Sequence, residues 1–140
     1  MKVLYESTVT NTGGRSGRAV SDDGNLALDI VRPAEQKEKG LPGTNPEQLF
    51  AAGYSSCFNG ALGRVLRLNG VRYESSTVTA TVTLYEDPED NGFRIGVKMR
   101  ASVKGLSREE AKKYIELAHT VCPYSKAIKG NVEVELEVLE

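Results

Sequence analysis

The sequence has no tryptophan, a single histidine and only two cysteines, and no apolar run long enough for a secretion signal or a membrane span. We therefore expect a cytoplasmic protein with no membrane partner. Thiols are kept reduced in the cytosol, and the disulfides found there are usually transient and catalytic. With two cysteines, the chain can form at most one internal disulfide.

An excess of charge of either sign is also missing. The chain has 18 basic and 19 acidic residues and a net charge of −1, with no basic stripe and no aromatic-rich RNA-binding motif. Nucleic acid is therefore not an expected partner. A length of 140 residues predicts one domain over residues 1–140, large enough to bury a core without a disulfide or a metal.

The first third of the chain predicts strands and a loop. Residues 2–8 are expected to form a short strand. Residues 17–21 and 26–30 flank the turn-rich segment 22–25, which favours a hairpin. Residues 32–44 contain several glycines, prolines and charges, and we expect a loop long enough to be functional.

A long helix is expected next. Asn45 can cap it, Pro46 suits its first position, and Gln48 stands three residues after the cap. The helix should run to about Asn69, with Gly70 as its C-terminal cap. Its many glycines and serines are poor helix formers, which indicates burial on most sides against other backbone or a partner.

The last half combines alternating strands with a second helix. Alternation of apolar and polar residues predicts strands over residues 71–86, 93–103 and 132–138. Ser107 and Glu110 form a capping box at the start of a helix, and Pro123 should end that helix. The order of strands, helix, two strands, helix and strand predicts an α+β fold with mostly antiparallel pairing.

Each cysteine has a structural and a chemical interpretation. Cys57 stands in the middle of the long helix, where a free cysteine is most often a small buried hydrophobe; a nucleophile would need a nearby positive group. Cys122 precedes Pro123 at a helix end, and its spacing excludes a thioredoxin-like Cys-x-x-Cys motif. A permanent disulfide, a metal site, a redox couple and two unrelated buried residues all remain open here.

Three polar residues, His119, Arg18 and Glu47, bear on whether the cysteines form a metal site or a redox couple. His119 with the two cysteines makes three ligands, whereas a structural zinc site needs four, usually in close pairs, so no metal is expected. Arg18 and Glu47 are candidates for tuning a thiol, and the simpler alternatives are a solvated strand arginine and an acid that stabilises the helix start. Glu47 and Cys57 lie ten residues apart on one helix, about 15 Å along its axis, so they can cooperate only between two copies of the chain.

Several motifs together resemble the organic hydroperoxide resistance proteins (Ohr) of the OsmC/Ohr family, and the resemblance covers essentially the whole chain. The matching segments are residues 17–21, 45–58, 121–125 and 130–132. Lys126 and Ile128 stand where asparagine and threonine are expected in this family, at the mouth of its pocket.

The resemblance implies a role for each site residue. Cys57 matches the peroxidatic cysteine and Cys122 the resolving one. Arg18 matches the arginine that stabilises the thiolate, and Glu47 the glutamate that holds that arginine. The implied fold has mostly antiparallel sheets packed around a long buried central helix, in an intertwined homodimer with active sites at the interface.

The implied activity is that of a cysteine-based organic hydroperoxide reductase with no bound cofactor. Such enzymes reduce organic and fatty-acid hydroperoxides, and a lipoylated protein regenerates them as the external dithiol. Phe50, Phe58 and Leu41 are expected to line an apolar substrate pocket. The alternatives are a non-enzymatic redox sensor or binding module on the same fold, and a structural-disulfide or metal protein.

Overall fold

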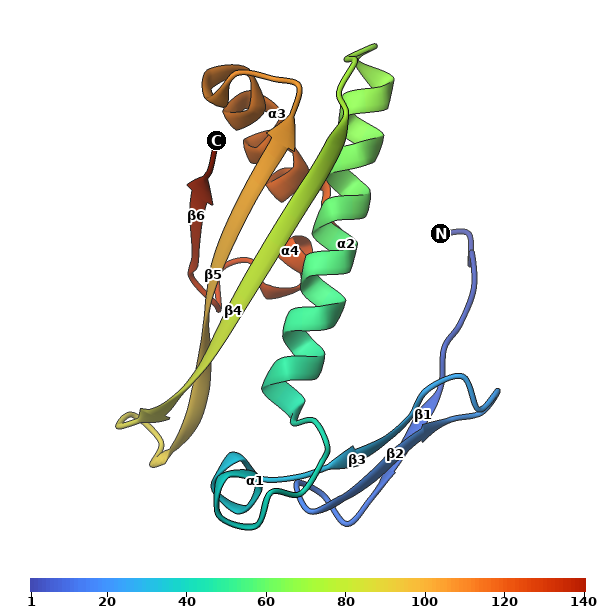
Figure 1. Cartoon of the computed structure of the whole chain (residues 1–140), viewed down its shortest axis with the longest axis vertical. Helices are drawn as coiled ribbons and strands as arrows, with labels where there is room; N and C mark the ends of the chain where they lie inside the picture. Colours follow the sequence, from blue (N-terminus) through green and yellow to red (C-terminus); the bar gives the residue numbers. More distant parts are fainter. The chain divides into compact units, whose positions relative to one another are not determined.

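A computed structural model describes residues 1–140 and shows six strands and four helices (Figure 1). Residues 1–49 and 50–140 form two packing units. The prediction of one domain stays a prediction. None of the four helices combines the length and apolar character that a membrane span requires.

The first unit contains a three-stranded antiparallel sheet in the order β1-β2-β3. Its strands are β1 (Val9–Thr12), β2 (Gly17–Ser21) and β3 (Ala27–Ile30). The hairpin of β2 and β3 is confirmed. The predicted strand over residues 2–8 is wrong, because β1 begins at Val9 opposite Ser21. The Asp22 N–H still donates to the Thr8 carbonyl at 3.1 Å, but the chain then turns away and residues 2–7 have no strand beside them.

The predicted loop over residues 32–44 contains a short helix, α1 (Pro33–Lys39). Pro33 occupies its first turn, and Gly40 ends it with a left-handed backbone at φ 64°. Between Pro33 and Gly40 the chain contains only alanine, glutamate, glutamine and lysine, which are strong helix formers. This explains why a segment rich in glycine and proline still forms a helix.

The long helix α2 (Pro46–Leu68) has the predicted ends. The Gln48 backbone N–H donates to the Asn45 side-chain oxygen at 2.8 Å, and Gly70 follows the helix at φ 64°. One face is buried, through Tyr54, Phe58, Leu62, Val65 and Leu66. The opposite face, including Ala52, Ser56 and Gly60, is exposed, so burial on most sides is not seen within a single chain.

The second unit places a mixed sheet against α2 and α3 (Figure 1). Its elements are β4 (Ser75–Asp87), β5 (Gly92–Lys104), α3 (Arg108–Val121), α4 (Pro123–Ile128) and β6 (Val134–Val138). Strand β4 pairs antiparallel to β5, whereas β6 pairs parallel to β5. Alternate residues of β5 are buried and share one core cluster with α2 and α3, so both helices cover the same face of the sheet.

Candidate functional site

The two cysteines meet although 65 residues separate them in the chain. The Cys57 and Cys122 sulfur atoms lie 3.4 Å apart, and both are free thiols. Cys122 is completely buried, whereas Cys57 is half-buried. A disulfide bond needs a sulfur–sulfur distance of about 2.0 Å, so the reduced pair requires a short further approach to close.

Pro123 determines where Cys122 sits. A residue before proline avoids the helical region, and Cys122 has φ −59° and ψ 123°. Helix α3 therefore ends before Cys122, and α4 begins at Pro123. Its backbone is still held on both sides, because the Cys122 N–H donates to the Ala118 carbonyl at 2.8 Å and its carbonyl accepts from the Lys126 N–H at 3.0 Å.

Within this unit, the surroundings of Cys57 favour the protonated thiol. Burial raises the pKa of Cys57, and the neighbouring Cys122 thiol raises it further, while the Tyr124 backbone N–H opposes both effects. A thiol with a raised pKa is a weak nucleophile at neutral pH. A reactive Cys57 therefore needs a positive charge beyond the groups that act on it here.

Several aromatic rings pack in the same core cluster as the two thiols. Tyr54 lies with its ring centre 6.1 Å from Phe50, 6.4 Å from Phe58 and 6.1 Å from Tyr124. Gly53 lets the Tyr124 ring come close to the backbone of α2, since a Cβ atom there would lie 3.0 Å from the Tyr124 hydroxyl. Phe58 has no exposed surface and belongs to the core, while Phe50 is half-buried.

A chain of hydrogen bonds, absent from the sequence-based expectations, runs beside the thiols. The Tyr54 hydroxyl and the Ser125 hydroxyl lie 2.6 Å apart, and His119 Nδ1 lies 2.9 Å from the same Ser125 oxygen. His119 thus bonds to Ser125, and no three His, Cys, Asp or Glu side chains gather in a geometry suited to a metal. The sequence contained one signal for this hydrogen-bond chain. Tyr54 lies three residues before Cys57 and Ser125 three residues after Cys122, so each lies about one helical turn from a cysteine.

The structure pairs Glu47 with Arg15 and not with Arg18. Both Arg15 terminal nitrogens donate to the Glu47 carboxylate, at 2.7 and 3.0 Å. This interaction holds the pKa of Glu47 below its usual range and raises that of Arg15. The Glu47 side chain is only 16% exposed. The expected Glu47–Arg18 pair is therefore not formed.

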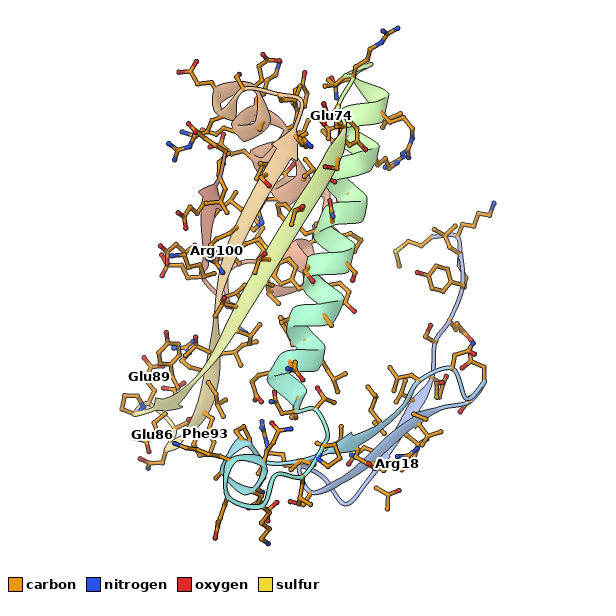
Figure 2. All side chains as sticks on the ribbon, viewed as in Figure 1. Arg18, Glu74, Glu86, Glu89, Phe93 and Arg100 are labelled. Carbon is orange, nitrogen blue, oxygen red and sulfur yellow. The ribbon has the colours of Figure 1, made fainter.

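Arg18 instead meets Asp29 on the neighbouring strand. The two residues are direct cross-strand partners, and the Arg18 guanidinium donates to the Asp29 carboxylate at 2.7 Å. Both side chains are about half exposed on the three-stranded sheet, where Figure 2 labels Arg18. Strand pairing thus fixes the partner of Arg18. Arg15 has no cross-strand partner, because it stands in the β1–β2 turn after Gly13 and Gly14, which both have positive φ.

Leu41, Lys126 and Ile128 are the remaining residues that the sequence assigned to the pocket or to its mouth. Leu41 is 42% exposed and lines a hollow of about 350 Å³ in the first unit, together with Ile30, Val31 and Pro42. In α4, Lys126 is exposed and Ile128 packs against the core cluster. The substrate-pocket role of Leu41, Phe50 and Phe58 stays a prediction.

Comparison with known proteins places these features in a family. The family model described as OsmC-like protein matches residues 36–137. The organic hydroperoxide resistance protein-like 1 of Staphylococcus saprophyticus is 52% identical over 139 residues, which cover 99% of this chain and 97% of that protein.

Solved structures agree in fold. The organic hydroperoxide resistance protein OhrB of Bacillus subtilis has a TM-score of 0.92 and 47% identity, covering 98% of this chain and 100% of its own. A Vibrio cholerae protein described as a putative organic hydroperoxide resistance protein, with captopril bound in one active site, has a TM-score of 0.87 and 37% identity over 99% of this chain and 94% of its own. With its α+β fold, its long helix and its adjacent cysteines, this chain belongs to the OsmC/Ohr family and is similar throughout its length to the organic hydroperoxide resistance proteins.

Proposed function

We propose that the chain is a thiol-dependent peroxidase that reduces organic hydroperoxides, including those of fatty acids, to alcohols. The observation that carries this proposal is the pair of free thiols 3.4 Å apart, with Cys122 fully buried and Cys57 partly accessible. Similarity to organic hydroperoxide resistance proteins over the whole chain supports the same activity.

The proposed reaction has two steps at the cysteines. The Cys57 thiolate attacks the terminal oxygen of the hydroperoxide, the O–O bond breaks, and the alkoxide leaves and takes up a proton as the alcohol. Cys57 is then a sulfenic acid. Cys122 condenses with it to a disulfide and releases water, and an external dithiol of the dihydrolipoyl type reduces the disulfide.

The first step needs a thiolate, and we propose Arg15 as the residue that stabilises it. The family resemblance implies an arginine held by Glu47, and Arg15 is the arginine that Glu47 binds through both carboxylate oxygens. Arg18 has its own partner in Asp29 and becomes the control residue. Since Glu47 lies ten residues from Cys57 on α2, the proposal requires a homodimer in which one copy supplies the Arg15–Glu47 pair to the other.

The substrate preference is proposed from the surroundings of the thiols. The aromatic side chains of Phe50 and Tyr124, which both keep some exposed surface, favour an organic substituent over water-like hydrogen peroxide. The captopril bound in an active site of the Vibrio cholerae relative supports a site that admits an organic molecule.

A peroxide-consumption assay tests the function. Purified protein with dihydrolipoamide should consume cumene hydroperoxide over many turnovers, and faster than hydrogen peroxide, while a monothiol donor should support it poorly. Cys57→Ser should abolish consumption. Full activity in Cys57→Ser would overturn the assignment, and a single slow turnover in the wild type would favour the redox-sensor alternative.

A further inference from the structure

The hydrogen-bond chain of Tyr54, Ser125 and His119 joins the three helices that carry or flank the two thiols. Tyr54 lies one helical turn before Cys57 on α2. Ser125 stands three residues after Cys122, in α4. His119 stands three residues before Cys122, at the end of α3. The contacts of 2.6 and 2.9 Å therefore link the helical turn next to one cysteine with the turns on both sides of the other.

Two of these three polar groups, Tyr54 and Ser125, lie in the core, where a missing partner is costly, and His119 is half-buried. Tyr54 is fully buried, and Ser125 is 4% exposed and is the one buried polar side chain among the core residues. Burial is the main reason that the pKa of Tyr54 is raised, which keeps its phenol neutral and able to donate. Removing one partner from a buried hydrogen bond costs more than the bond itself contributes, so each member holds the others in place.

The backbone around Cys122 is already fixed by its own helices, as described above. What these backbone bonds do not fix is the position of α4 and the end of α3 against α2, on which the sulfur–sulfur distance depends. The Tyr54–Ser125 bond crosses this gap directly. That bond joins α2 to α4, whereas the Phe58 and His119 rings, 6.3 Å apart, pack α2 against α3.

We propose that Tyr54, Ser125 and His119 form a positioning clamp that holds Cys122 within reach of Cys57 and thereby sets the rate and equilibrium of disulfide closure. The catalytic part of this inference rests on the proposed function, whereas the thiol–disulfide equilibrium does not. In the closing step the Cys122 thiol loses its proton, its sulfur attacks the sulfur of the Cys57 sulfenic acid, and the S–O bond breaks. The hydroxide leaves with that proton as water.

A loosened clamp has a specific consequence. The two sulfurs must move from 3.4 Å to about 2.0 Å, and a pair that spends less time in contact closes more slowly. The sulfenic acid then lives longer, and a second peroxide can oxidise it to the irreversible sulfinic acid. Cys122 forms and breaks no bond when Cys57 attacks the first peroxide, and its thiol raises the pKa of Cys57, so a loosened clamp should not slow that attack.

The test compares Tyr54→Phe and Ser125→Ala with two matched controls. Tyr114→Phe removes the hydroxyl of another tyrosine packed against the same core cluster. Ser76→Ala removes a hydroxyl that also bonds to α2, at Asn59, but does not link α2 to α3 or α4. Tyr54→Phe removes the same hydrogen bond but keeps the aromatic ring in the core. This variant therefore tests the clamp even if Ser125→Ala folds poorly.

The first measurement uses no peroxide. Each full-length protein is equilibrated with glutathione redox buffers, and the fraction of the Cys57–Cys122 disulfide is measured by alkylation and mass spectrometry. Loss of one hydrogen bond should lower the equilibrium constant for closure roughly five- to tenfold. A tenfold loss corresponds to a potential about 30 mV less negative. The controls should stay within about twofold of wild type.

The second measurement follows over-oxidation. With excess cumene hydroperoxide, sulfinic acid at Cys57 should build up several-fold faster in both clamp variants than in the controls, and the first step should be no slower in a single turnover. An unchanged closure equilibrium in folded Tyr54→Phe, or an equal shift in the controls, would overturn the clamp. If wild type consumed no peroxide but the clamp variants still shifted the equilibrium, the proposed function would fail and the clamp would stand.

Discussion

The replacement of Arg15 by alanine gives the sharpest test of how Cys57 becomes reactive. Within its own unit, the pKa of Cys57 is raised, mainly by burial. A thiolate at neutral pH therefore requires an added positive charge, and the arginine bound by Glu47 is Arg15. We expect Arg15→Ala to move the pH profile of Cys57 alkylation upward and to slow peroxide attack.

The size of the effect follows from electrostatics. A unit charge about 4 Å from a thiolate contributes about 4 kcal/mol at an effective dielectric constant of 20. The Glu47 carboxylate, bonded to the guanidinium at 2.7 and 3.0 Å, cancels part of this attraction. If about half remains, the thiolate fraction at pH 7 should fall roughly ten- to a hundredfold in Arg15→Ala, since about 1.4 kcal/mol corresponds to a factor of ten.

The assay measures alkylation by iodoacetamide against pH in a Cys122→Ser background, where Cys57 is the only thiol. Arg18→Ala is the matched control, because its guanidinium is bonded to Asp29. Glu47→Gln should have a smaller effect than Arg15→Ala, because it loosens the guanidinium but also removes the carboxylate charge that opposes it. An unshifted profile in Arg15→Ala would refute the assignment, and a shift in Arg18→Ala alone would restore Arg18 to the role.

Three further outcomes are expected. Cys122→Ser should give one turnover of peroxide and then sulfinic acid at Cys57, seen as an added mass of two oxygens; a disulfide-free variant that kept cycling with a dithiol would contradict the resolving role. The Arg15–Glu47 pair lowers the pKa of Glu47, so its contribution to stability is full at neutral pH and is lost as the pH falls through that lowered pKa. Glu47→Gln should therefore lower the melting temperature at pH 7 and have less effect at acid pH, and equal effects at both would argue against the pair. Phe58→Ala empties a fully buried position and should cost about 3–5 kcal/mol in the free energy of unfolding, measured by urea denaturation. A cost under about 1 kcal/mol would show that the core refills the space.

Local signals in the sequence were enough for the long helix and the hairpin. The cap at Asn45, the proline at the first helical position and Gly70 act within a few residues, and the structure confirms both ends of α2. The turn at residues 22–25 is equally local. The strand expected at residues 2–8 is not formed, because a strand needs a hydrogen-bonded neighbour and its neighbour, β2, ends at Ser21 opposite Val9.

The site depended on a mixture of local and distant contacts. The motif around Cys57 and the one around Cys122 pointed to a redox pair through their resemblance to a family. The partner of Glu47 did not follow from that resemblance, since Arg15 and Arg18 both lie about 30 residues away and differ only in how the chain presents them. A cross-strand neighbour occupies Arg18, while the β1–β2 turn leaves Arg15 free to reach Glu47.

The sequence by itself determined the number of thiols, the ends of α2, the break at Pro123 and the family, because these depend on residue identity and on interactions within a few positions. Only the tertiary structure decided that Cys57 and Cys122 lie 3.4 Å apart, that Tyr54, Ser125 and His119 bond across three helices, and that Glu47 binds Arg15. These contacts join residues distant in the chain, and their geometry depends on how whole helices and strands pack.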